Sequence, residues 1–198
     1  MRYAPEHKEG TRARLVKATG ALAKRQGFSG TGIDGLMAAA GLTSGAFYAH
    51  FRSKNELLEA IVDNELQRSV ALFAQQSPAT AMKVIEGYLS PAHVAHPESG
   101  CAVPALAPEI ARADAATQQA FERGVLALKE QFRTLTGDDA RAWSLMAQLV
   151  GAVMLARGLP SESTQQALLD GVLQQVRRLV DDAPDEADCA ENTEQNRL

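Results

Sequence analysis

The chain has 198 residues, of which 45% are hydrophobic and 22% charged, a composition that suits a globular protein with its own core. No apolar run approaches the roughly 20 residues that span a bilayer, and the N-terminus lacks the apolar segment of a secretory signal, so we expect a cytoplasmic protein without membrane association. The net charge of −4 is unevenly spread: residues 1–58 hold nine Lys and Arg against four Asp and Glu, and the remainder holds eleven against twenty, which indicates that a polyanion would bind the first part alone.

The first 26 residues are predicted to be an arm followed by a helix. Residues 1–10 read as a mobile arm whose basic side chains could follow a phosphate backbone, or simply as a solvated end. Residues 11–26 show helical spacing of apolar positions. Lys24 is predicted to lie outside that apolar stripe with the other basic residues of the segment. Gly27 ends the helix, and Phe28 turns into the core.

Two short helices joined by a tight turn are predicted next. Thr31 is placed as the N-cap of a helix over about 33–40, where its free amides also suit a phosphate. Gly41 ends that helix. Thr43 or Ser44 would cap a second helix, whose inner face holds Phe47 and Phe51 and whose outer face holds Ala46, Tyr48 and His50. This arrangement is typical of the helix-turn-helix, in which the second helix enters the DNA major groove.

The run GLTSGAFYAHFRSKNELL at residues 41–58 resembles the TetR family of bacterial transcriptional regulators. In that family two glycines, a Tyr-x-His-Phe sequence and a Ser-Lys pair stand at these spacings. The resemblance covers about residues 11–66. It implies an all-α chain, with a three-helix DNA-binding domain at 8–54 (motif about 32–51) and a helical ligand-binding and dimerisation domain at 55–182.

The resemblance also implies which residues meet double-stranded DNA. Tyr48, His50 and Lys54 would reach phosphates, which position the protein. The start of the reading helix would meet base edges through Thr43, Ser44, Gly45 and Ala46. A lysine often stands in the family at the place of Ser44, so we expect modest direct base reading and a large contribution from DNA shape.

The rest of the chain reads as further helices separated by prolines and glycines, with no strand pattern. Ser53 and Glu56 form a capping box for a long helix to about residue 76. The later elements are expected at about 78–89, 101–112, 114–135, 139–158 and 161–182, with a loop or a short broken turn at 91–100 and a disordered acidic tail at 183–198.

The last two long helices carry more apolar residues than one face needs, which suggests a dimer surface in a four-helix bundle. The predicted interface residues are Leu149, Val153, Leu169, Val172 and Val176. The alternative is that these helices only bury each other within one chain.

Large or pliable side chains in the middle helices suggest a pocket for an unidentified small-molecule inducer. The predicted lining residues are Met82, Tyr88, Cys101, Phe121, Trp143 and Met146. Ordinary core packing is the alternative for each of them, and no cofactor is expected.

Two more specific hypotheses concern Cys101, namely thiol-based sensing and metal binding. At the start of a short helix its thiol could sense electrophiles or oxidants, although a lone cysteine more often serves packing. His93, His96 and Cys101 could bind a metal, but no fourth ligand is suitably spaced, so no metal site is expected. Cys189 lies too far along the chain for a disulfide framework.

These observations predict a homodimeric, ligand-responsive regulator, most often a repressor in this family, that binds a palindromic operator and is released by an inducer. A helical enzyme or carrier is the first rival, but there is no Glu-x-x-His pair, Gly-rich phosphate loop or supported Ser/His/Asp arrangement. The second rival is a nonspecific architectural DNA-binding protein. Its charged residues after position 58 should be mostly basic, whereas in this chain they are mostly acidic.

Overall fold

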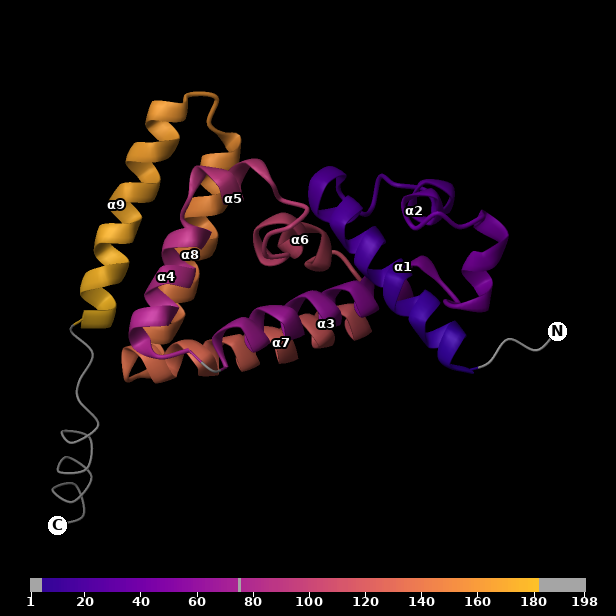
Figure 1. Cartoon of the computed structure of the whole chain (residues 1–198), viewed down its shortest axis with the longest axis horizontal. Helices are drawn as coiled ribbons and strands as arrows, with labels where there is room; N and C mark the ends of the chain where they lie inside the picture. Colours follow the sequence, from indigo (N-terminus) through magenta and orange to yellow (C-terminus); the bar gives the residue numbers. More distant parts are fainter. Residues whose placement is uncertain (1–4, 75, 182–198) are drawn as a thin grey trace, which may run out of the picture. The chain divides into compact units, whose positions relative to one another are not determined.

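All regular structure in the computed structural model, which describes residues 5–74 and 76–181, is helical. This confirms the predicted all-α class (Figure 1). The elements are α1 Pro5–Gln26, α2 Ile33–Ala39, the 3₁₀-helix η1 Ser44–Ala49, α3 Lys54–Phe73, α4 Pro78–Tyr88, α5 Pro91–Ala95, α6 Val103–Ile110, α7 Ala115–Thr136, α8 Asp139–Gly158 and α9 Glu162–Asp181. The tail predicted at 183–198 lies outside the described residues. No helix in the described ranges has the length and apolarity needed to cross a membrane.

The chain divides into two compact units. Unit 1 consists of Met1–Ser69 and His96–Val125, and unit 2 of Val70–Ala95 and Leu126–Leu198. The long helices α3 and α7 each run from one unit into the other. The predicted boundary between residues 54 and 55 was meant to separate a DNA-binding part from a ligand-binding part, not two sets of packed residues. That boundary stays a prediction.

In unit 1, α1 supports the helix-turn-helix from behind, and its first turn differs from the expectation. The helix begins at Pro5, so residues 5–10 are helical rather than an arm; a proline is well tolerated at a helix start because no partner awaits its missing N–H. The helix ends at Gly27, whose φ of +83° favours glycine. Large side chains fully buried in this unit include Leu15, Leu36, Met37, Phe47, Phe51, Leu57, Ile61, Leu66 and Leu106.

Lys24 is buried, which corrects the prediction that it lies outside the apolar stripe. Its ammonium lies 2.7 Å from a Glu65 carboxylate oxygen of α3 and donates to the Gly100 carbonyl at 2.8 Å. The side chains are only 1% and 4% exposed. A buried charge needs a partner, and a partner 41 positions away cannot be seen in the spacing of α1.

Helices α3 and α7 approach closely in unit 1 at Gly124. A Cβ atom there would lie 2.6 Å from Cβ of Leu66. Asp114 caps α7, because its carboxylate accepts from the Thr117 amide at 3.0 Å. The close approach of the two helices therefore depends on the missing side chain of one glycine.

In unit 2, α8 and α9 lie side by side (Figure 1). Leu145 and Val153 of α8 and Leu169 and Val176 of α9 have no exposed surface. The segment 91–100, expected to be a loop or a short broken turn, begins with the five-residue helix α5. Ser90 precedes α5 and caps its start, since the Ser90 hydroxyl accepts a hydrogen bond from the His93 amide at 3.2 Å.

Candidate nucleic-acid interface

The start of α2 is built differently from the prediction. Gly32, not Thr31, is the N-cap, and no side chain caps the helix. The Thr31 hydroxyl instead donates to the Gly27 carbonyl at 2.9 Å. Gly27 is the first residue after α1, so this bond closes the turn between α1 and α2.

The second helix of the motif forms as η1, a 3₁₀-helix, rather than the α-helix expected. Its N-cap is Thr43, but neither Thr43 nor Ser44 makes the predicted capping bond. Short helices with a glycine near the start have little to favour the α-form. Phe47 and Phe51 are buried as predicted, at 0% and 1% exposure, and they anchor η1 to the core.

The residues predicted to meet base edges lie at the exposed start of η1. Thr43 and Gly45 are exposed, and Ser44 and Ala46 are half-buried. The Ser44 hydroxyl donates to the Asp34 carboxylate of α2. This bond joins the two helices of the motif, and it occupies the hydroxyl that was expected to read a base.

Tyr48 and His50 lie on the outer side of η1. Tyr48 is 70% exposed, while its ring packs edge-on against Phe47 with centroids 5.2 Å apart. Tyr48 is thus in contact with the buried core at one edge while most of its side chain faces solvent, and its phosphate contact stays a prediction. Burial, and then the positive charges of Lys8 and Arg12, lower the pKa of His50. Its Nδ1 atom is buried and makes no hydrogen bond to a described residue.

Arg12 is a candidate that the sequence analysis did not single out. Its guanidinium carbon lies 4.6 Å from the centre of the Phe51 ring, a cation–π distance. This contact holds a positive charge close to His50. In the sequence, Arg12 could be recognised only as one of several basic residues on the outer face of the first helix. That pattern does not show that Arg12 lies over the Phe51 ring.

Lys54 lies at the first turn of α3. Its ammonium donates to the Ser29 carbonyl at 2.9 Å and lies 4.8 Å from the centre of the Phe28 ring. Burial lowers the pKa of Lys54, and the Glu109 charge opposes that shift. The predicted capping box is present in altered form: the Ser53 hydroxyl accepts from the Glu56 amide at 3.1 Å, but the Glu56 carboxylate accepts from the Arg52 amide.

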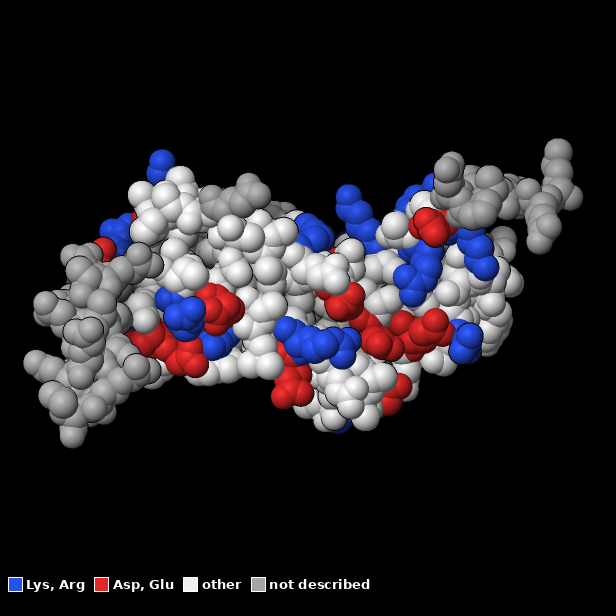
Figure 2. All heavy atoms as spheres, turned by 90° about the horizontal axis from the view of Figure 1, so that it is seen from below, with Lys and Arg blue, Asp and Glu red and all other residues white. Residues whose placement is uncertain are grey.

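The basic residues of the helix-turn-helix region mostly lack carboxylate partners. Among the described residues before position 58, Lys24 has a carboxylate within 4.0 Å, whereas seven others have none: Lys8, Arg12, Arg14, Lys17, Arg25, Arg52 and Lys54. In unit 2, ion pairs engage Lys129, Arg133, Arg141 and Arg177. On the face drawn in Figure 2, the right-hand part, which is unit 1, carries basic side chains along one edge and acidic ones below them. The unpaired charge is available to an external anion.

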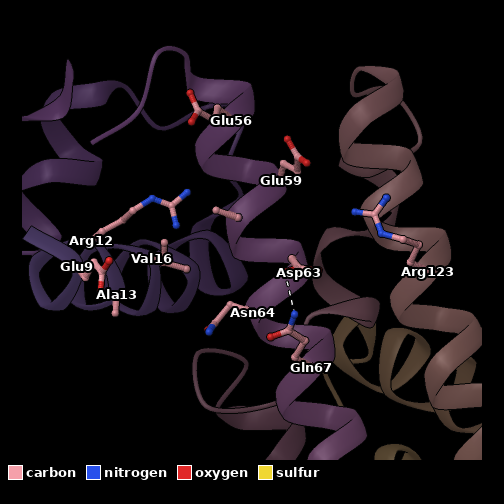
Figure 3. A pocket seen from close by; sticks show the side chains of 11 residues that line it. Glu9, Arg12, Ala13, Val16, Glu56, Glu59, Asp63, Asn64, Gln67 and Arg123 are labelled. Atoms are coloured by element: carbon pink, nitrogen blue, oxygen red, sulfur yellow. Dashed lines mark hydrogen bonds between the residues drawn. The ribbon is translucent and has the colours of Figure 1, made fainter. Parts of the chain in front are cut away.

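A groove of about 510 Å³ lies between α1, α3 and α7 within unit 1 (Figure 3). Carboxylates line it from both α1 and α3, with arginines from α1 and α7: Glu9, Glu56, Glu59, Asp63, Arg12 and Arg123. The four carboxylates outnumber the two arginines, so the groove as a whole disfavours phosphates.

The residues predicted for an inducer pocket fall in both units. Met82, Tyr88, Trp143 and Met146 belong to unit 2, and Cys101 and Phe121 to unit 1. Met146 is buried, whereas Trp143 is 43% exposed and so is not ordinary core. The other four are half-buried. The pocket stays a prediction.

The predicted dimer residues are mostly covered within their own chain. Leu149, Val153, Leu169 and Val176 are buried between α8 and α9, and Val172 is half-buried. This is what the within-chain alternative expects of those four positions. The exposed large apolar residues of α8 are Trp143, Met154 and Leu155, at 43%, 41% and 64%.

Cys101 is half-buried, with its sulfur 4.0 Å from the Ser69 hydroxyl. His93 lies in unit 2, where its Nδ1 is 2.7 Å from the Tyr88 carbonyl. In the part of the chain that the structure describes, no group of three or more His, Cys, Asp or Glu could hold a metal ion.

These features define a helix-turn-helix DNA-binding protein with a second helical domain. The sequence profile described as "Bacterial regulatory proteins, tetR family" matches residues 15–61. The match covers the helix-turn-helix segment and the start of α3, which is the part of the chain where the sequence resembles this family. No curated protein sequence matches it significantly.

Solved structures share the fold over most of the chain. The reduced form of NemR from E. coli has a TM-score of 0.70 at 21% identity, covering 88% of this chain and 100% of NemR. A TetR-family regulator from Cytophaga hutchinsonii has a TM-score of 0.70 at 20% identity, over 91% and 96% of the two chains. A TetR regulator from Chloroflexus aurantiacus has a TM-score of 0.69 at 24% identity, over 87% and 96%. At these identities the likeness establishes the fold alone.

Proposed function

We propose that the chain is a repressor that binds a palindromic operator as a homodimer and leaves it when a small molecule binds. Residues 8–54 would form the DNA-binding domain, and residues 55–182 the ligand-binding and dimerisation domain. The observation that supports this proposal most is the exposed Tyr48 on a short helix anchored by Phe47, in a unit whose Arg12 and Lys54 have no carboxylate within 4.0 Å among the described residues. As a DNA-reading protein it would act in the cytoplasm.

The phosphate contacts would come from Tyr48, His50 and Lys54, with Arg12 beside them. Base reading would fall to Thr43 and to the backbone and methyl groups around Gly45 and Ala46, since the Ser44 hydroxyl is bonded to Asp34. Few side chains there can form bidentate base contacts. DNA shape would therefore contribute a large part of the specificity.

A dimer is proposed because a single DNA-binding domain of this kind contacts too few base pairs to select one site in a genome. Two heads would read half-sites about 34–36 Å apart. The exposed Met154 and Leu155 of α8 and the half-buried Val172 of α9 supply apolar surface that a second copy would cover. The buried Leu149 and Val153 would then support the interface from within the chain.

An inducer site is proposed in the second domain around Met82, Tyr88 and Met146. Pliable and aromatic side chains suit an apolar ligand. A coupling of about 1–3 kcal/mol between inducer and DNA would change operator affinity about five- to 150-fold. The ligand would act by favouring a form of the dimer whose heads do not fit the half-site spacing.

The nonspecific architectural binder is the rival that shares DNA binding. The test is selection of duplexes from a random-sequence pool by the wild-type protein, followed by gel shifts of the selected duplex against a scrambled one at rising salt. Selection of a palindrome bound at least about a hundred-fold more tightly than the scrambled duplex supports the proposal. Equal affinity for both duplexes would refute it.

A further inference from the structure

A carboxylate of α6 holds the loop that leads into the helix-turn-helix. Glu109 Oε1 accepts from the Phe28 amide at 2.8 Å, and Oε2 accepts from the Ser29 amide at 2.6 Å and from the Ser29 hydroxyl. These residues are about 80 positions apart. Three donors thus converge on one side chain, which is half-buried beside α1.

The end of α1 leaves room for this carboxylate. At Gly27 a Cβ atom would lie 3.1 Å from Glu109 Oε1, and the φ of +83° disfavours any other residue. Burial by itself would raise the pKa of Glu109, but the hydrogen bonds from Ser29 and Phe28 and the charge of Arg112 outweigh it and keep the pKa below its ordinary value. The group is therefore a carboxylate at neutral pH, able to accept all three hydrogen bonds.

Lys54 holds the same loop from its carbonyl side. Its ammonium donates to the Ser29 carbonyl at 2.9 Å, next to the Phe28 ring. The main chain of Ser29 is thus held by Glu109 at its amide and by Lys54 at its carbonyl. An ammonium has three donors, so two remain for a phosphate.

We propose that Glu109 is a positioning residue for DNA binding, which fixes the Ser29 carbonyl that in turn holds the Lys54 ammonium in place for a phosphate. The inference rests on the DNA-binding function proposed above. A lysine on a flexible four-carbon stem loses rotamer freedom when it meets a phosphate, and an ammonium already held at Ser29 loses less. A displacement of α6 that breaks the Glu109 bonds therefore weakens DNA binding.

The test measures the Kd of a fluorescent duplex, selected from a random pool by the wild-type protein, for purified Glu109→Gln at fixed salt. One amide oxygen cannot accept from all three donors, and the amide NH₂ would face one of them. Expected is a Kd about ten-fold higher than wild type. The matched control is Glu122→Gln, an exposed glutamate of α7 without an ion pair to the described residues, for which the Kd stays within about two-fold.

A double-mutant cycle separates positioning from a general loss of stability. In a Lys54→Met background, Glu109→Gln should raise the Kd by less than about two-fold, because the ammonium it positions is gone. Circular dichroism establishes that each variant is folded at the temperature used. Independent, additive effects of the two substitutions would overturn the inference.

Ser29→Ala provides a milder variant, since it removes only the hydroxyl bond and keeps both amides. Expected is a Kd raised about two- to five-fold, an effect also absent in the Lys54→Met background. If the wild-type protein selects no duplex, the proposed function fails. If it selects one that Glu109→Gln and Ser29→Ala bind as tightly as wild type does, only the positioning role of Glu109 fails.

Discussion

Two lysines of unit 1 show how the surroundings of an ammonium decide its role. Lys24 is buried against Glu65, so its charge serves packing between α1 and α3. Lys54 is half-buried, and its partners are a carbonyl and an aromatic ring rather than a carboxylate. The Lys24 ammonium is buried in an ion pair and so cannot contact DNA. The Lys54 ammonium has no carboxylate partner within 4.0 Å among the described residues, and its remaining hydrogen-bond donors stay available for a phosphate.

The first prediction concerns salt. Lys54→Met should reduce the slope of log K against log[salt] by about 0.9 for each phosphate that the protein no longer neutralises, because fewer counterions are released. Binding of the selected duplex is measured from about 50 to about 200 mM salt. Lys83→Met is the control, since Lys83 is exposed on α4 in unit 2 and has no carboxylate partner among the described residues. An equal reduction of the slope in both variants would argue against a specific phosphate contact by Lys54.

The second prediction concerns pH. In the free protein, burial and the charges of Lys8 and Arg12 lower the pKa of His50, so its ring holds a proton less readily than an ordinary histidine does. A DNA phosphate beside the ring would favour the charged form and raise that pKa. The complex would then bind a proton that the free protein does not, so affinity should rise as pH falls through the pKa of the complex and level off below the pKa of the free protein.

The measurement is the Kd of the selected duplex from about pH 8 to about pH 5.5, the range in which histidine titrates. His50→Gln should flatten the curve, since glutamine does not titrate. A variant with the same pH dependence as the wild type would show that another group takes up the proton.

At the scale of elements, the helix-turn-helix is held by contacts between its parts rather than by helix propensity. The reading element η1 has six residues and no side-chain cap. Its position depends on the buried Phe47 and Phe51 and on the bond from Ser44 to Asp34. An isolated helix of this length would not be stable in water, so tertiary packing determines its form.

The third prediction concerns the close approach of α3 and α7. Gly124→Ala should lower the free energy of unfolding by about 1–3 kcal/mol, because the added methyl would lie 2.5–3.0 Å from three atoms of the buried Leu66. Gly171→Ala on α9 is the control: it is exposed, nothing lies within 4 Å of the added carbon, and alanine favours the helix, so stability should rise by about 0.5–1 kcal/mol. Urea denaturation measures both. Stabilisation by Gly124→Ala would contradict the packing described.

At the scale of the whole molecule, the acidic groove and the unpaired cations of unit 1 limit how DNA can be approached. Glu56, Glu59 and Asp63 line the groove on α3, and their charges disfavour phosphates there. In the proposed complex, this charge separation within one unit would orient the protein on DNA. Binding by a pair of heads then depends on how two chains associate.

The fourth prediction tests that association. Leu155→Glu should shift the protein from dimer to monomer, because a carboxylate would be buried in the proposed interface at a site now 64% exposed. Light scattering gives the mass. Leu126→Glu on α7, at a site 46% exposed, should leave the dimer intact. A Leu155→Glu protein that remains a dimer would place the interface elsewhere.

The sequence by itself determined the helical class and the helix-turn-helix, because both follow from the spacing of residues that are close together in the chain. Apolar spacing and the glycines at 27 and 41 locate α1 and α2, and the motif around Tyr48, His50 and Lys54 indicates the class of DNA-binding protein. Phe47 and Phe51 were predicted to face inward for the same reason.

The tertiary structure alone decided the features that depend on distant residues. Lys24 is buried because Glu65 pairs with it, and Thr31 closes a turn because its hydroxyl reaches the Gly27 carbonyl. The helix η1 is a 3₁₀-helix because packing outweighs its weak propensity. Glu109 reaches the loop at Phe28 and Ser29 from about 80 positions away. Local spacing carries no information on such contacts, since they form only when the chain brings separate helices together.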